Sequence, residues 1–179
     1  RSGRHSDHMN TFAPGKLVVL GEYAVLDGAP AIVAAVDHGV ACTYEASPTG
    51  QRIETPTHDD RFVRSALRDA PAGTYRFTCS PALTLPAKPG LGGSAAATVA
   101  ATEMSRVLRG LSTAPDLVHA DAARVHFEVQ GSGSGIDVAA AAYGGTLRFQ
   151  QGTSRPVPCP EFVSVYSGQC ATTGPRIEA

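Results

Sequence analysis

The sequence predicts a domain that contains both strands and helices, on two observations. Apolar, strand-like segments dominate the first part of the chain, at Leu17–Leu20, Ala31–Val36 and Val40–Glu45. Two long helix-like segments follow at Ser94–Arg109, which is rich in Ala, and at Pro115–Val129, which has a partly helical spacing of apolar residues.

The first strand is preceded by residues 1–9, which resemble an expression remnant and are set apart from a domain at 10–179. After the third strand, residues 47–60 are polar and contain Pro and Gly, so we expect a loop or hairpin there. Arg61–Asp69 has a short helical pattern, and Thr74–Leu85 alternates as a strand that leads toward the first long helix.

Glycines bound the predicted helices of the second half. Gly110 follows the first long helix at the place expected for a C-terminal cap. The alanine run before Gly144-Gly145 predicts a short helix that these glycines end. Thr146–Gln150 and Glu161–Tyr166 have the character of two further strands.

The composition excludes several classes of function. Fifteen Lys and Arg stand against 16 Asp and Glu, and no basic run is present, so we do not expect nucleic acid as a partner. No apolar run has the length of a membrane span and no signal-peptide pattern is visible, which favours a soluble, cytoplasmic protein without a membrane partner. The cysteines lack close spacing, so we expect free thiols at Cys42, Cys79, Cys159 and Cys170.

A glycine-rich loop before the first long helix is the central feature of the sequence. It runs from Lys88 to Ser94 and contains Gly90, Gly92 and Gly93. Such a loop leaves backbone N–H groups uncovered at the positive end of a helix, and this arrangement binds anions. We therefore expect a nucleotide phosphate there, with the Ser94 hydroxyl either capping the helix or reaching a metal ion.

The loop by itself also fits other interpretations. A Walker-type loop needs Lys before Ser94, where this chain has Gly93. Residues 90–95 formally match a dinucleotide fingerprint with Asp116 downstream, but Pro89 interrupts the tight strand-to-helix turn that this fingerprint requires. A purely structural turn is the third interpretation, because glycine is the default residue of tight turns.

A second glycine-rich loop, residues 131–135, precedes the short helix and places Asp137 in its first turn. The helix dipole favours a charged carboxylate there. Asp137 is therefore either an ordinary helix-start acid or a carboxylate aimed at a reacting hydroxyl beside the anion site. Lys16, one of only two lysines in the chain, follows Pro14-Gly15 next to the first strand. It is either a solvated edge residue or a member of the same site.

Together these features resemble the GHMP kinases, the superfamily of galactokinase, homoserine kinase, mevalonate kinase and phosphomevalonate kinase. The resemblance covers residues 11–179 and is strongest in three blocks, at 13–26, 86–96 and 131–141. It implies an α+β, two-layer ATP-binding domain (ribosomal protein S5 domain 2-like) with helices packed on a mixed sheet. Gly21-Glu22-Tyr23 and the third block are most similar to the phosphomevalonate kinase branch, with the mevalonate kinase branch as the alternative.

The resemblance also implies ATP-dependent phosphoryl transfer to a small molecule, with Mg²⁺ as the metal. Asp137 would be the catalytic carboxylate, Lys16 would act beside it on the substrate hydroxyl, and Ser94 would help to hold the metal. The acceptor would be contacted by Lys16, Glu22, Tyr23, Ser134, Gly135 and Asp137. The phosphates of ATP would be bound by Lys88, Pro89, Gly90, Leu91, Gly92, Gly93, Ser94, Ala95 and Ala96.

Some features depart from the family pattern. Gly93 replaces the first Ser of the usual Gly-Leu-Gly-Ser-Ser, and His126 stands where mevalonate kinase has a Mg²⁺-binding Glu. Family members are longer and have a third glycine-rich motif, which has no match here. We therefore expect the C-terminal kinase domain to be absent or to lie on another chain. A homodimer and a non-catalytic half-kinase that binds a partner chain are further options.

Overall fold

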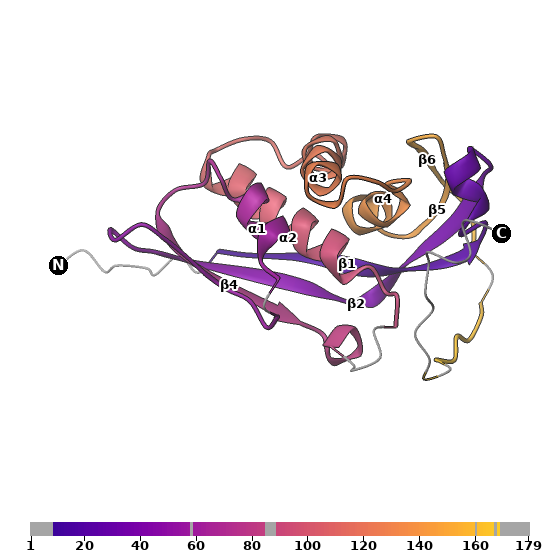
Figure 1. Cartoon of the computed structure of the whole chain (residues 1–179), viewed down its shortest axis with the longest axis horizontal. Coiled ribbons are helices and arrows are strands. Elements are labelled where there is room, and N and C mark those ends of the chain that lie inside the picture. Colours follow the sequence, from indigo (N-terminus) through magenta and orange to yellow (C-terminus); the bar gives the residue numbers. More distant parts are fainter. Residues whose placement is uncertain (1–8, 58, 85–88, 160, 167, 169–179) are drawn as a thin grey trace.

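A computed structural model describes residues 9–57, 59–84, 89–159, 161–166 and 168. Within them, a six-stranded sheet lies against a layer of helices (Figure 1). The elements in chain order are β1 (Met9–Leu20), η1 (Ala24–Asp27), β2 (Ala31–Ala46), β3 (Gln51–Glu54), α1 (Arg61–Ala66), β4 (Gly73–Cys79), η2 (Pro81–Thr84), α2 (Gly93–Leu108), α3 (Pro115–Gln130), α4 (Ile136–Tyr143), β5 (Thr146–Gln150) and β6 (Thr153–Pro156).

The sheet is organised on β2, which pairs with three other strands. β1 runs antiparallel to β2 along most of the length of β2. β5 pairs with the first part of β2, and β4 pairs with the second part. β3 lies parallel to β4 at one edge, and β6 lies antiparallel to β5 at the other. The sheet is therefore mixed, and the predicted α+β, two-layer class is confirmed.

Two predicted strands, Ala31–Val36 and Val40–Glu45, are one continuous strand. β2 passes through Asp37, His38 and Gly39 without ending, because β1 stays paired on both sides of this point. Pro14 pairs with Gly39 and the next residue, Gly15, pairs with Val36, so the extra residues Asp37 and His38 form a bulge in β2. A proline without an N–H is tolerated beside such a bulge.

Several other boundaries differ from the prediction. β3 forms inside the segment that we expected to be a loop or hairpin, and it pairs in parallel with β4. The predicted strand to Leu85 ends at Cys79 and continues as the 3₁₀ helix η2. Residues 161–166 form no strand, with Val163 90% and Val165 88% exposed, whereas the unpredicted β6 pairs with β5. Strand formation depends on an available partner strand, which local sequence does not reveal.

Helix α2 is the centre of the helical layer, because it contacts β1, β2, α1, α3 and α4. The residues that it buries are mostly small, with Ala95, Ala96, Ala100 and Ala101 fully buried. Small side chains let the helix axis approach the sheet and the neighbouring helices closely. The hydroxyl of Thr11 on β1 also donates to the Ala100 carbonyl at 2.8 Å, which ties the helix to the strand that carries Lys16.

A second core cluster holds α4 in place at the other end of the sheet. Ile136, Ala139 and Ala140 pack there against Val33 of β2 and Phe149 of β5. Because α4 packs on both the sheet and α2, its first turn is fixed relative to the start of α2. The two predicted glycine-rich loops are thus brought to one region by the packing of the helices that follow them.

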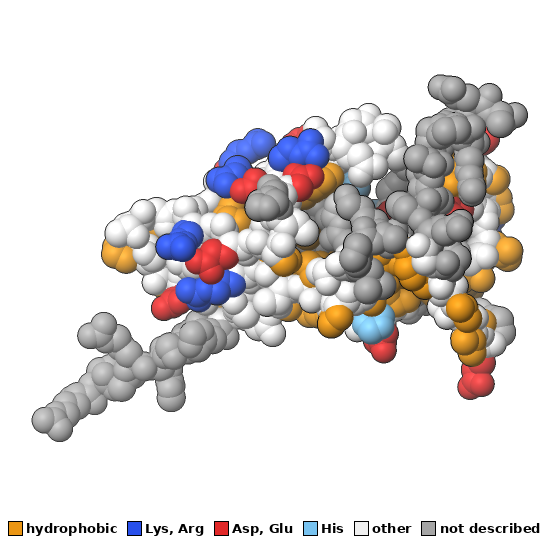
Figure 2. Space-filling model, turned by 60° about the horizontal axis from the view of Figure 1, so that its bottom comes forward, with side chains coloured by type: hydrophobic (Ala, Val, Ile, Leu, Met, Phe, Trp, Pro, Cys, Tyr) orange, Lys and Arg blue, Asp and Glu red, His pale blue; other side chains and the backbone are white. Residues whose placement is uncertain are grey.

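The surface carries mixed charge. Figure 2 shows Lys or Arg side chains interspersed with Asp or Glu side chains on one half of the displayed face. Several charged side chains of the described residues are paired, such as Arg61 with Asp59 at 2.8 Å and Arg76 with Glu45 at 3.0 Å. In the part of the chain that the structure describes, no helix is long and apolar enough to span a membrane.

Candidate functional site

An ion pair between β1 and α4 forms the centre of the site. Lys16 Nζ lies 3.2 Å from Asp137 Oδ1, with the side chains 9% and 36% exposed. Lys16 is therefore not a solvated edge lysine, because its ammonium group is nearly buried and directed at the carboxylate. The packing of α4 on β1 brings these two predicted residues together from distant parts of the chain.

The first glycine-rich loop lies directly over Lys16. The backbone N–H of Lys16 donates to the Leu91 carbonyl at 2.9 Å. A Cβ atom on Gly15 would lie 2.6 Å from that carbonyl oxygen, and one on Gly92 would lie 2.8 Å from Lys16 Cγ. Both distances are below normal contact, so glycine at 15 and 92 allows the loop backbone to approach the strand.

The start of α2 leaves backbone donors available. Gly92 is the N-cap residue in a left-handed conformation (φ 71°), and the first intrahelical bond runs from the Ala96 N–H to its carbonyl. The N–H groups of Gly93, Ser94 and Ala95 therefore have no acceptor within the helix. No acidic residue is present in the first turn of this described helix. This helix start suits an anion, as the sequence predicts.

Ser94 does not cap α2, because the cap position belongs to Gly92. Its hydroxyl instead lies 3.4 Å from Nε2 of His126 on α3. The His126 side chain is buried and stacks on Phe62 of α1, with ring centroids 4.9 Å apart. Burial lowers the pKa of His126, an effect that the nearby Asp137 carboxylate opposes.

The start of α4 is built on a second left-handed glycine, Gly135 (φ 81°). The hydroxyl of Ser134 accepts the N–H of Ile136 at 3.3 Å, and Asp137 places its charge in the first turn. The chain itself thus supplies both an acceptor and a negative charge at this helix start. That geometry holds the Asp137 carboxylate toward Lys16.

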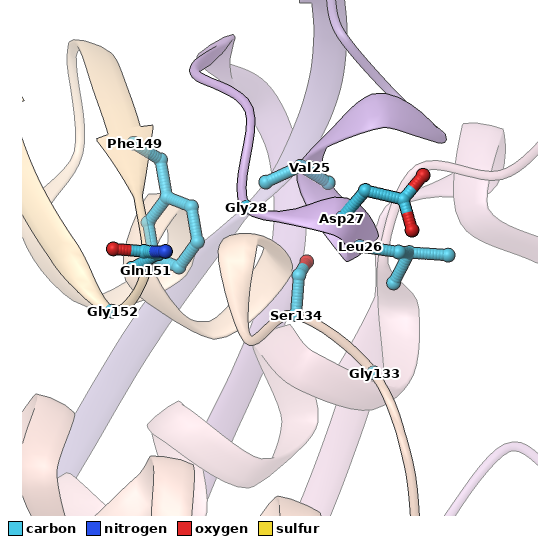
Figure 3. Close-up of a pocket in the computed structure, with 9 residues that line it drawn as sticks. All are labelled: Val25, Leu26, Asp27, Gly28, Gly133, Ser134, Phe149, Gln151 and Gly152. Carbon is cyan, nitrogen blue, oxygen red and sulfur yellow. The ribbon is translucent and has the colours of Figure 1, made fainter.

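An open cavity of about 600 Å³ lies next to this second loop. Figure 3 shows the Ser134 side chain pointing toward η1, with Phe149 and Gln151 on the other side. The cavity is lined by residues of η1, of the loop before α4, and of β5 and the turn after it: Val25, Leu26, Asp27, Gly28, Gly133, Ser134, Phe149, Gln151 and Gly152. One of its lining residues, Ser134, lies three residues before Asp137, which makes this a candidate acceptor cavity.

The remaining predicted residues lie around this centre. Glu22 is exposed and Tyr23 is half-buried at the start of η1; neither is among the described residues that line the cavity. Pro89 is half-buried and Gly90 is exposed with a φ of 73°. Lys88, the other predicted nucleotide-binding lysine, lies outside the described residues.

Sequence reasoning missed three parts of the site. It did not predict the bond from the Lys16 N–H to the Leu91 carbonyl, the stacking of Phe62 on His126, or Phe149 as part of the cavity wall. None of these contacts has a local signal, because each joins residues from different elements. Cys42, Cys79 and Cys159 are free thiols, as predicted, and Cys170 is outside the described residues.

Comparisons with known proteins identify relatives of this chain. The family model for the GHMP kinases N terminal domain matches residues 62–145. The chain is 30% identical to a mevalonate kinase of Thermococcus sibiricus, over 90% of this chain and 58% of that protein. It is 33% identical to a phosphomevalonate kinase of Streptomyces sp. strain CL190, over 77% of this chain and 48% of that protein.

The fold is also shared with solved structures. The mevalonate kinase of Methanococcus jannaschii superposes with a TM-score of 0.74 at 20% identity, covering 88% of this chain and 57% of that one. The fold and site define an α+β domain in which a glycine-rich helix start faces a lysine–aspartate pair. The chain belongs to the GHMP kinase superfamily and has the fold of its N-terminal domain. It spans about half the length of the curated relatives that it matches.

Proposed function

We propose that this chain is the ATP-binding part of a kinase that transfers the γ-phosphoryl group of ATP to 5-phosphomevalonate. The observation that supports it most directly is the Lys16–Asp137 pair, at 3.2 Å, beneath the open start of α2. An anion-binding helix start and a carboxylate with an adjacent cation are the two parts that phosphoryl transfer to a hydroxyl requires.

Each residue would have a defined task in this reaction. The N–H groups at the start of α2 would hold the phosphates, and the ammonium of Lys16 would stabilise negative charge on the acceptor oxygen. That oxygen forms the new bond to phosphorus as the bond to the ADP oxygen breaks. Asp137 would orient the hydroxyl and take its proton late in the step. Positioning and charge neutralisation, rather than covalent catalysis, would lower the barrier.

The metal expected with ATP fits the donors that are present. Among the described residues, no group of three His, Cys, Asp or Glu could hold a metal ion by itself. A nucleotide-bound Mg²⁺ needs only one or two protein donors, because phosphates and water supply the rest. The exposed Ser94 hydroxyl at the start of α2 would be such a donor, and the metal would neutralise phosphate charge.

The acceptor would approach through the cavity beside Ser134. The choice of 5-phosphomevalonate is supported by the Gly21-Glu22-Tyr23 motif, by the third sequence block and by the 33% identity to a phosphomevalonate kinase. Mevalonate is the second candidate, because seven of the curated relatives are mevalonate kinases.

Turnover by the intact protein tests both candidates. ADP release would be measured with ATP and Mg²⁺ and with either mevalonate or 5-phosphomevalonate. We expect the higher kcat/KM with 5-phosphomevalonate, and a preference for mevalonate would support the second candidate. Tight ATP binding without turnover of either alcohol would instead indicate a non-catalytic half-kinase. No ATP binding at all would contradict the proposal.

A further inference from the structure

Two side chains from different helices form a pair of donors at the open start of α2. Ser94 Oγ and His126 Nε2 are 3.4 Å apart, which is longer than a typical hydrogen bond. Two ligands that each lie about 2.1 Å from one cation, at right angles, are separated by about 3 Å. The observed spacing is therefore close to that of two neighbouring ligands of a single metal ion.

The imidazole of this pair is fixed in place before any ligand arrives. His126 is only 8% exposed, and its ring stacks on Phe62 at 30° between the planes. α3, which carries His126, packs against both α1 and α2. A donor that is already held in its binding orientation loses little entropy when it binds a ligand.

The charge around the pair favours a cation. Asp137 lies near enough to interact electrostatically with His126, and no basic residue occupies the first turn of the described helix α2. Lys16, which lies beneath the loop before α2, is already paired with Asp137. A neutral imidazole nitrogen and a hydroxyl oxygen can each offer a lone pair to a metal.

We propose that the imidazole of His126, beside Ser94 Oγ, is a ligand of the divalent cation of the bound nucleotide and makes this site favour Co²⁺ over Mg²⁺. Imidazole binds first-row transition metals well, whereas Mg²⁺ prefers oxygen ligands. The inference rests on the proposed function only in that a nucleotide supplies the remaining ligands.

Pulsed electron paramagnetic resonance on the intact protein tests this assignment. The protein would be labelled with ¹⁵N in its histidines and loaded with Mn²⁺ and a non-hydrolysable ATP analogue. We expect a ¹⁵N coupling to Mn²⁺ that is lost in His126→Gln. His119→Gln on the same helix is the matched control, because His119 contacts Tyr143 of α4 instead. The ¹⁵N coupling in His119→Gln should equal that of the unmodified protein.

Nucleotide affinity gives a second readout. Calorimetric titration with Co²⁺ and with Mg²⁺ should show that His126→Gln lowers the Co²⁺-to-Mg²⁺ affinity ratio by about tenfold, and that His119→Gln leaves it unchanged. Thermal melting would show whether each variant is folded. If His126→Gln does not fold, the coupling in the unmodified protein alone decides.

The outcomes separate this inference from the proposed function. Absence of a histidine coupling in the unmodified protein, or its persistence in His126→Gln, would overturn the metal assignment even if the enzyme turns over. A histidine coupling with no turnover of any acceptor would overturn only the kinase assignment. No nucleotide binding would overturn both.

Discussion

The two glycine-rich helix starts use the same backbone device and reach opposite electrostatic results. Gly92 before α2 and Gly135 before α4 are both left-handed N-cap residues, with φ of 71° and 81°. At α4, Ser134 accepts one N–H and Asp137 supplies a negative charge. At α2, the first turn of the described helix has no acid, and its N-cap residue has no side chain to accept an N–H.

Under the proposed function, this difference would let one domain hold both the phosphates of a nucleotide and the carboxylate that takes the proton of the acceptor. At the start of α4, Ser134 accepts a backbone N–H and Asp137 supplies the negative charge, so the helix dipole stabilises the Asp137 carboxylate. The start of α2 is left open, so its dipole is available to phosphate groups from outside. Lys16 lies beneath one loop and pairs with the acid of the other, and it connects the two electrostatically.

Removing the acid at α4 should have the largest effect. Asp137→Asn keeps the size of the side chain but removes the proton acceptor, so we expect kcat to fall by about 10²–10⁴-fold. Nucleotide affinity should change little, because the phosphates would bind at the other helix start. Steady-state kinetics and calorimetry on the intact protein would measure the two quantities. A parallel loss of nucleotide affinity would show that the two starts do not act separately.

Removing the cation between the two starts should have the next largest effect. Lys16→Met keeps a buried aliphatic side chain under the loop but leaves Asp137 without its partner. We expect kcat to fall by about 10²–10³-fold, which is typical for loss of one electrostatic contact in a transition state. A normal kcat would show that Lys16 is only structural. Thermal melting of the variant provides the control for folding.

Substituting the glycines compares the two starts directly. Gly92→Ala would place a Cβ 2.8 Å from Lys16 Cγ, so Lys16 must move, and we expect kcat to fall by up to about 100-fold. Gly135→Ala meets no atom within 4 Å and should cost only the left-handed strain, about 1–2 kcal/mol of unfolding free energy.

Gly110→Ala is the matched control for this pair. Gly110 also has a positive φ, of 66°, and open space around it, but it lies beyond the far end of α2. Urea unfolding should give similar losses for Gly110→Ala and Gly135→Ala, and kinetics should leave Gly110→Ala unaffected. Equal kcat values for Gly92→Ala and Gly110→Ala would contradict the close approach of the loop to Lys16.

The smallest expected effect concerns the histidine of α3 that contacts α4. Burial lowers the pKa of His119 in the folded protein, and the Asp116 carboxylate partly opposes this. Below about pH 6.5, the unfolded chain gains a proton that the folded chain resists, so stability falls as the pH falls. His119→Gln should reduce this loss in urea unfolding between pH 7 and pH 5. An unchanged pH dependence would show that His119 is not a source of it.

Many of the elements could be predicted because their signals are local. The helices α2 and α3 begin and end within one residue of the predicted bounds, and α4 forms from the predicted alanine run. The strands were harder, because β2 continues through an expected break and β3 and β6 depend on their partner strands. The glycines that precede Ser94 and Asp137 likewise predicted that both residues lie at the start of a helix.

The sequence by itself determined which groups are available: two glycine-rich helix starts, one acid at 137, a lysine at 16 and a histidine at 126. Only the tertiary structure decided which of them meet. Lys16 reaches Asp137, and His126 reaches Ser94, because α2 packs on β1, α3 and α4 at once. Local propensity reports the conformation of a short segment, whereas contacts between distant segments depend on how buried surfaces fit together.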